Sequence, residues 1–334
     1  MKNIYILSLL ALFIISCSPN NQSKFDKIQN SRNNIINVKD QIHEVSTGDV
    51  LCGTNCKVVA NNKYLIIGDY KSTTELIHIF DINTFKHLIT TGTFGQGPNE
   101  IGILGDIVWN ETSNEVYVTD NAKFIVYSYN IDSLLLDNNY LPYIKTQFDP
   151  LNVPVYYHFY NDTIYYTQNV MPKPDGSFDE ATGLWNIKTN TFKLLAYNHP
   201  DVKKKRIYNA IIPSNNQYVE FNFRNDLISF FDLEGNLIYN IFGPNWNNDK
   251  LAHFYDCVST DKYLVAPYNG FTYTDYKPTT MCHIFTLKGD YLATIDLGYS
   301  IMRIAYDKLN NRIFFWFNDV IQCGYIDIDN LNLQ

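Results

Sequence analysis

The residues best suited to binding or catalysis are polar side chains near the beginnings of short apolar segments. They are Asn55, Asp106, Asn209, His253 and Arg303. Amide, carboxylate, imidazole and guanidinium groups together provide hydrogen-bond donors, acceptors and both signs of charge. If the fold gathers the beginnings of these segments around one axis, their side chains form a polar mouth that could hold a ligand.

A glycine-rich connection at residues 92–100 adds Gln96, Asn99 and Glu100 to this candidate site. Its glycines permit a close backbone approach, and Pro98 stiffens the chain, so a purely structural turn is the alternative interpretation. The sequence lacks the lysine and hydroxyl residue of a phosphate-binding loop. Nucleotide binding is therefore not indicated.

Compact catalytic and metal-binding motifs are missing from the sequence. It has no Gly-x-Ser-x-Gly elbow, no His-Glu-x-x-His pair and no acidic calcium loop. Catalysis would then need residues from distant segments. A hydrolase or lyase of this kind predicts that Glu100, Asp106, Asn209 and His253 approach one space of substrate or metal size; no cofactor is indicated.

Two long polar segments, residues 169–183 and 269–280, carry large side chains that could contact a ligand. These are Met171, Phe178, Phe271, Tyr273 and Tyr276. Aromatic faces on loops can bind sugars or peptides. The alternative is packing between sheets, because aromatic residues make up 15% of the chain.

The elements that position these residues are short strands. Runs rich in Tyr, Phe, Ile and Val alternate with Asn, Asp and Gly clusters, which predicts an all-β chain. The first unit has strands at residues 56–60, 64–68, 76–82 and 87–91.

This four-strand unit recurs along the chain. Its first strands lie near Cys56, Ile107, Val155, Asn209, Phe254 and Met302. The spacing of about 45 to 55 residues predicts a six-bladed β-propeller of four-stranded antiparallel blades. The last unit ends too early for a fourth strand, so we expect residues 35–38 or 42–45 to complete it. Seven blades or an irregular terminal sheet are the alternatives.

Residues 92–100 resemble the Gly-x-Gly-Pro-Gly-Glu signature of six-bladed β-propeller lipoproteins related to TolB-like and NHL-repeat propellers, with Asn99 in place of the second glycine. Residues 242–245 are a weaker match. The resemblance covers roughly residues 35 to 330. It implies that the glycine-rich connection lies on the face of the propeller that binds partners.

The beginning of the chain predicts export and lipid attachment. Lys2 precedes an apolar run at residues 4–15, shorter than the roughly 20 residues of a membrane span. Residues 14–17, Ile-Ile-Ser-Cys, resemble the cleavage box of bacterial lipoprotein precursors. We expect a signal peptide at 1–16, lipidation of Cys17, a flexible tether at 17–34 and the propeller domain at 35–334. An ordinary signal peptide or an uncleaved anchor is the alternative.

Ser18 follows the expected lipidated cysteine and gives no retention signal for the inner membrane. We therefore expect the protein to be located at the outer membrane. Of the other cysteines, Cys52 and Cys56 could close a small loop, whereas Cys257, Cys282 and Cys323 are expected to be buried thiols rather than metal ligands.

The formal net charge of -8 argues against nucleic acid as a partner. The basic run at residues 203–206 is either a solvated loop or a contact for an anionic ligand or lipid head group. Together these features favour a noncatalytic envelope protein that is attached to a membrane by lipid and binds a carbohydrate, peptide or protein partner on one face.

Overall fold

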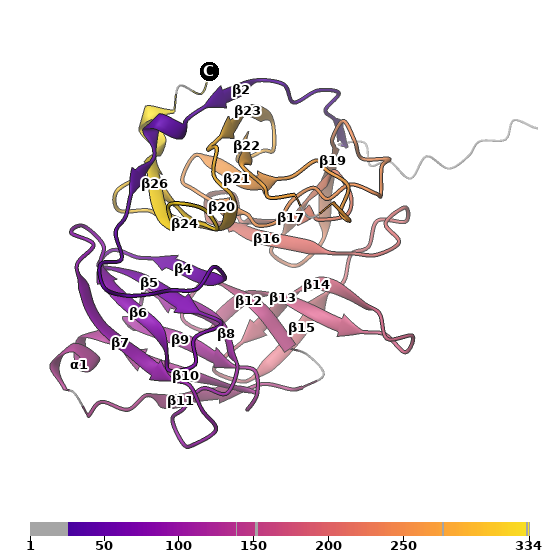
Figure 1. Ribbon diagram of the computed structural model, residues 1–334. Coiled ribbons are helices and arrows are strands. Elements are labelled where there is room, and N and C mark those ends of the chain that lie inside the picture. Colours follow the sequence, from indigo (N-terminus) through magenta and orange to yellow (C-terminus); the bar gives the residue numbers. More distant parts are fainter. Residues whose placement is uncertain (1–25, 138, 151–152, 276, 332, 334) are drawn as a thin grey trace, which may run out of the picture.

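Six sheets, whose blade strands pair antiparallel, are arranged around a central channel in the computed structural model, which describes residues 26–137, 139–150, 153–275, 277–331 and 333 (Figure 1). Each blade runs outward from its first strand, and the first strand of each blade contacts a neighbouring blade. The prediction of an all-β, six-bladed propeller is confirmed. Cys17 and the expected signal peptide lie outside the described residues, as does Tyr276.

The blades follow one another along the chain. Blade 1 contains β4 (Cys56–Ala60), β5 (Tyr64–Asp69), β6 (Glu75–Asp81) and β7 (His87–Thr93). Blade 2 contains β8 (Leu104–Asn110), β9 (Glu115–Asp120), β10 (Ile125–Asn130) and β11 (Tyr143–Gln147). Blade 3 contains β12 (Val153–Phe159), β13 (Ile164–Pro172), β14 (Phe178–Asn186) and β15 (Thr191–Leu195).

The second half of the ring repeats this order. Blade 4 contains β16 (Ile207–Ile212), β17 (Gln217–Asn222), β18 (Leu227–Asp232) and β19 (Leu237–Phe242). Blade 5 contains β20 (Val258–Ser259), β21 (Tyr263–Tyr268), β22 (Met281–Thr286) and β23 (Tyr291–Asp296). Blade 6 contains β24 (Ile301–Asp307), β25 (Arg312–Phe317) and β26 (Cys323–Asp327).

The apolar second strands explain why the blades pack face to face. Every residue of β5 and of β25 is buried, since each strand is covered by a neighbouring blade on both sides. Asparagine lies at or just after the end of three first strands, at Asn61, Asn110 and Asn161, because its side chain bonds the following turn. Asn110 Oδ1, for example, accepts hydrogen bonds from the backbone N–H groups of Thr112 and Ser113 at 3.0 and 3.1 Å.

The polar segment before blade 1 runs along the outer edges of three blades (Figure 1). β1 (Lys27–Ile28) pairs parallel with β19, and β2 (Ile35–Asn37) pairs parallel with β23. β3 (His43–Glu44) pairs antiparallel with β26 and forms the outermost strand of blade 6. We call residues 27–44 the N-terminal strap.

The strap extends the folded domain toward the N-terminus. Residues 27–34, which the sequence placed in the tether, include β1 and lie against blades 4 and 5. The Arg32 guanidinium is buried against the Asp226 carboxylate, with 2.6 Å between Nη1 and Oδ1. Burial therefore begins before residue 35.

Other features of the fold are few. Among the described residues the one α-helix is α1 (Ile131–Leu136), and no helix is long and apolar enough to cross a membrane. Cys52, Cys56, Cys257, Cys282 and Cys323 are buried and unbridged.

Alternating strand direction gives the ring two different faces. The turns between first and second strands, and between third and fourth strands, lie on one face, which we call the hairpin face. The loops between second and third strands, and the connections from blade to blade, lie on the other, which we call the connection face. The glycine-rich connection and both aromatic segments are on the connection face.

Candidate functional site

One polar or charged residue from each innermost segment lies at a similar depth in the central channel. We call this set the channel ring; its members, in blade order, are Lys57, Asp106, Tyr156, Tyr208, Asp256 and Arg303. Side chains of a first strand alternate between the channel and the blade interface. The ring lies near the beginnings of the first strands, where the sequence predicted a polar mouth.

Blades 1 and 2 contribute an ion pair to the channel ring. Lys57 Nζ lies 2.7 Å from Asp106 Oδ1, and the other carboxylate oxygen accepts the Tyr157 N–H at 2.8 Å. Burial alone would lower the pKa of Lys57, but the Asp106 carboxylate outweighs it and the pKa is raised. Lys57 is therefore a cation, and it also lies over the Tyr156 ring.

Blades 5 and 6 place a second cation beside a second carboxyl group. Arg303 donates to the Met302 carbonyl at 2.7 Å and to the Tyr156 hydroxyl at 3.3 Å. Asp256 accepts the N–H groups of Cys257 and Ile304 at 2.9 and 3.3 Å. Burial raises the pKa of Asp256 despite the nearby Arg303 and Lys57.

His158 joins the channel wall to the contact between blades 3 and 4. Its Nε2 lies 2.9 Å from Asn209 Oδ1, and burial lowers the pKa of His158 to about 4. The imidazole is therefore neutral near pH 7, so Nε2 donates to the amide oxygen.

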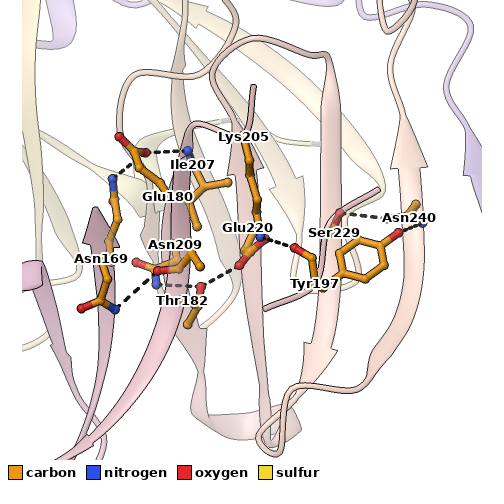
Figure 2. Close-up of polar contacts among 12 residues, drawn as sticks. Asn169, Glu180, Thr182, Tyr197, Lys205, Ile207, Asn209, Glu220, Ser229 and Asn240 are labelled. Carbon is orange, nitrogen blue, oxygen red and sulfur yellow. Dashed lines mark hydrogen bonds and ion pairs between the residues drawn. The ribbon is translucent and has the colours of Figure 1, made fainter. Parts of the chain in front are cut away.

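Asn209 is in turn held by a polar network between blades 3 and 4 (Figure 2). Its Nδ2 donates to Thr182 Oγ1 at 3.1 Å, and Thr182 donates to Glu220 Oε1 at 2.7 Å. Glu220 Oε2 lies 2.6 Å from Lys205 Nζ, and both side chains are buried. Asn209 therefore has a structural role in joining the blades.

A cavity of about 180 Å³ occupies the channel beside the ring. It extends past Val59, Val108 and Val258 toward Ala60 and Tyr306, near the hairpin face. The ring contributes donors, acceptors and tyrosines at one end, whereas the walls are mostly apolar. The ring's charged groups already have partners within the protein, so the ring stabilises contacts between blades.

The structure brings Asp106, Asn209 and Arg303 together at the channel and places the other predicted residues elsewhere. Asn55 precedes β4, where its carbonyl accepts the Tyr70 N–H at 3.3 Å. His253 is fully buried next to Tyr268 and is not among the residues that line the channel cavity. Burial lowers the pKa of His253.

The glycine-rich connection is held by contacts of its own. Glu100 Oε2 accepts the Gly97 N–H at 2.6 Å, and Lys123 Nζ donates to the carbonyls of Gly97 and Glu100 at 2.8 and 2.6 Å. Asn99 has φ 63°, a conformation that asparagine tolerates. Gln96 is exposed on this loop. Glu100 and His253 therefore do not share a space with Asp106 and Asn209, as the hydrolase or lyase hypothesis required.

Sequence reasoning missed Lys57, Tyr156, His158, Tyr208 and Asp256 in the channel. The available signal was position, because each lies within or just before a first strand.

Among the described residues, no three His, Cys, Asp or Glu side chains gather as metal ligands would.

The loop aromatics form a second candidate site. Phe178, Phe271 and Tyr273 are 38, 42 and 40% exposed. Met171 is half-buried in β13.

A cation lies over each of the three exposed rings. The Arg206 guanidinium is 3.5 Å from the Phe178 centroid, and Arg224 is 3.8 Å from that of Tyr273. Lys277 Nζ is 4.6 Å from the Phe271 centroid. These cation–aromatic pairs all lie on the connection face of blades 3 to 5. Arg206 belongs to the basic run at residues 203–206, whereas the sequence did not predict Arg224 or Lys277.

No family model matches the chain, and no curated protein matches its sequence. Solved structures share the fold. Regucalcin, a calcium-binding protein of Agrobacterium tumefaciens, superposes with a TM-score of 0.60 at 5% identity, over 88% of this chain and 95% of regucalcin.

Two proteins from Bacteroides are also similar. One, described as exported, is from Bacteroides fragilis, with a TM-score of 0.55 at 10% identity over 88% of each chain. The other is a DUF4221 family member from Bacteroides vulgatus, with a TM-score of 0.54 at 10% identity over 86% of this chain and 95% of that one. At these identities the likeness shows the fold alone.

Proposed function

We propose that this chain is a noncatalytic cell-envelope protein that binds a carbohydrate, peptide or protein partner on its connection face. The observation that carries the proposal is the set of three cation–aromatic pairs, Phe178 with Arg206, Tyr273 with Arg224, and Phe271 with Lys277. Exposed aromatic residues and arginines are the side chains that contribute most to recognition surfaces.

The loops suit binding because the propeller supports them rigidly. Ala252 donates its N–H to the Phe271 carbonyl at 2.8 Å, and Tyr273 donates its N–H to the Lys250 carbonyl at 3.0 Å. A loop fixed in this way loses little conformational entropy when a partner binds. The channel ring is a weaker candidate, since Lys57 is paired with Asp106, and Arg303 and Asp256 are each hydrogen-bonded within the protein.

The envelope address rests on the sequence signals at Lys2, the apolar run and Cys17, with Ser18 favouring the outer membrane. The Bacteroides fragilis protein of the same fold is described as exported, which agrees with that address. A lipid at Cys17 would hold the propeller at the membrane and leave its surface available to partners.

Glycan and peptide arrays probed with the full chain in nonionic detergent test the proposal. We expect reproducible binding to one ligand class and a loss of about tenfold or more in affinity for Phe271→Ala combined with Tyr273→Ala. Leu136→Ala, which truncates a side chain 88% exposed on α1, is the matched control. No binding by folded protein, or equal binding by the double variant, contradicts a binding role for this face.

A further inference from the structure

A second pocket opens on the connection face, between the loops of blades 4 and 5. It has a volume of about 200 Å³, and its lining includes Lys203, Lys204, Arg224, Tyr273, Asp201 and Asp249. It contains part of the basic run at residues 203–206, for which the sequence left a solvated loop and an anionic ligand as alternatives.

The structure divides this basic run into two parts. Lys205 is buried, with its Nζ 2.6 Å from Glu220 Oε2, and Arg206 donates to the Phe178 carbonyl. Lys203 and Lys204 are exposed at the pocket. Within the part of the chain that the structure describes, no hydrogen bond or ion pair engages either amino group. Lys205 and Arg206 therefore stabilise the fold, whereas Lys203 and Lys204 remain available to bind a ligand.

Arg224 adds a third available cation. Its guanidinium stacks on the Tyr273 ring at 3.8 Å, and no carboxylate pairs with it among the described residues. Stacking uses the face of the guanidinium and leaves the donors at its edge free. The chain has a net charge of -8, but three unpaired cations surround this one pocket. Their local positive charge favours an anionic ligand.

The carboxylates of Asp201 and Asp249 in the lining indicate which kind of anionic ligand the pocket suits. Carboxylates repel a uniformly acidic peptide but accept hydrogen bonds from hydroxyl groups. A sugar that carries both an acidic substituent and free hydroxyls can satisfy both kinds of lining residue, and its ring can lie against the exposed part of Tyr273.

Resting on the proposed binding function, we infer that this pocket binds an acidic polysaccharide. Its anionic substituent lies on Lys203, Lys204 and Arg224, and its hydroxyls face Asp201 and Asp249. The polymer can continue toward Phe178 and Arg206, because the Phe223 N–H donates to the Arg206 carbonyl at 2.8 Å and joins the two regions.

The test is equilibrium binding of the full chain in nonionic detergent to polygalacturonate and to heparin, which separate a carboxylate from a sulfate substituent. Neutral galactan, polyglutamate and vesicles containing anionic phosphatidylglycerol are the comparison ligands. We expect binding to at least one acidic polysaccharide, weakened by salt because exposed charges are screened. Lys203→Gln with Lys204→Gln should lower the affinity about tenfold or more.

Lys262→Gln with Lys308→Gln is the matched control. It removes the same charge from the hairpin face, where both lysines are 65% exposed. If both double variants lost the same affinity, net charge alone would explain the loss, and the proposed site would be overturned.

Equal binding of polyglutamate, preference for the vesicles, or equal binding of neutral galactan would each overturn the acidic-polysaccharide assignment. If no acidic polysaccharide binds while the arrays give another ligand sensitive to Phe271 and Tyr273, this inference fails and the proposed function stands.

Discussion

At the residue scale, buried histidines couple the fold to pH. Burial lowers the pKa of five of the seven histidines, His78, His158, His199, His253 and His283. Each resists protonation in the folded protein and gains a proton more readily in the unfolded chain. The contribution of these histidines to the free energy of unfolding is therefore fully present above the ordinary histidine pKa, and it decreases as the pH falls below that value.

The first prediction concerns His158, whose pKa falls from 6.5 to about 4 on folding. The unfolded chain binds more protons across this window, so the free energy of unfolding should decrease from pH 6.5 toward pH 4. His158→Gln should reduce that slope by up to about 1.4 kcal/mol per pH unit. Urea unfolding at several pH values measures it. Val108→Ala, a channel-wall control that keeps the imidazole, should retain the parent slope; an unchanged slope in His158→Gln contradicts the prediction.

The second prediction separates a structural from a ligand-binding role for residues 95–100. Lys123→Met removes the charged donor to the Gly97 and Glu100 carbonyls, so the free energy of unfolding should fall by about 2 to 3 kcal/mol. Lys63→Met, at a lysine that is 57% exposed, should cost about 1 kcal/mol or less. Chemical denaturation gives both values. Unchanged stability together with lost partner binding would instead identify this connection as a ligand contact.

At the element scale, the N-terminal strap pairs with strands of three blades that follow it by more than two hundred residues in the sequence. Its pairing with β19, β23 and β26 covers strand edges that would otherwise be open to other chains. Val38, fully buried next to blades 5 and 6, supplies an apolar contact to the strap. The strap is therefore part of the closure of the ring.

Arg32→Ala tests the strap. The substitution leaves the Asp226 carboxylate buried without its cation, so the free energy of unfolding should fall by about 3 to 5 kcal/mol. Lys27→Ala, which breaks the exposed Lys27–Asp290 pair, should change it by about 1 kcal/mol or less. Urea unfolding with limited proteolysis is the measurement. In Arg32→Ala, protease cleavage should begin within residues 27–44. A strap as resistant to the protease as that of the parent would contradict its role in closing the ring.

The sequence predicts the blades better than it predicts the strap or the channel ring. Strands such as β5 carry their own apolar pattern and turn residues, so they could be located without their partners. β1 has only two residues, too few for a periodic pattern, and its partner β19 is distant in sequence. Its pairing depends on tertiary contacts.

The channel ring is hard to predict for a related reason, which is register. First strands have irregular pairing between Leu104 and Ile107, between Pro154 and Tyr156, and between Ile301 and Arg303. Each irregularity changes which residues point into the channel. The irregularity between Pro154 and Tyr156 accounts for the missed Tyr156, whereas Lys57 and Tyr208 lie in first strands with regular pairing.

At the scale of the whole molecule, charge is unevenly distributed. The chain is acidic overall, yet Lys203, Lys204 and Arg224 gather on the connection face without paired carboxylates among the described residues. A local cationic region on an acidic protein attracts anionic ligands while the remaining surface repels them. Membrane attachment would add a further constraint, because it fixes the distance over which the propeller can reach a partner.

Cys17 lies between an apolar segment and a polar stretch, where we expect it to carry the lipid. Cys17→Ser removes the sulfur that would carry the lipid, and the variant should therefore lose its acyl mass and leave the membrane fraction. The propeller should keep its stability, because the strand pairing and burial of the described domain involve residues from Lys27 onward. Membrane fractionation, intact-mass analysis and urea unfolding measure the three outcomes. Ser18→Ala, which leaves the sulfur in place, is the control. A parent chain with unmodified Cys17, or a Cys17→Ser chain with unchanged mass and membrane retention, would contradict the lipid anchor while leaving the six-bladed fold as described.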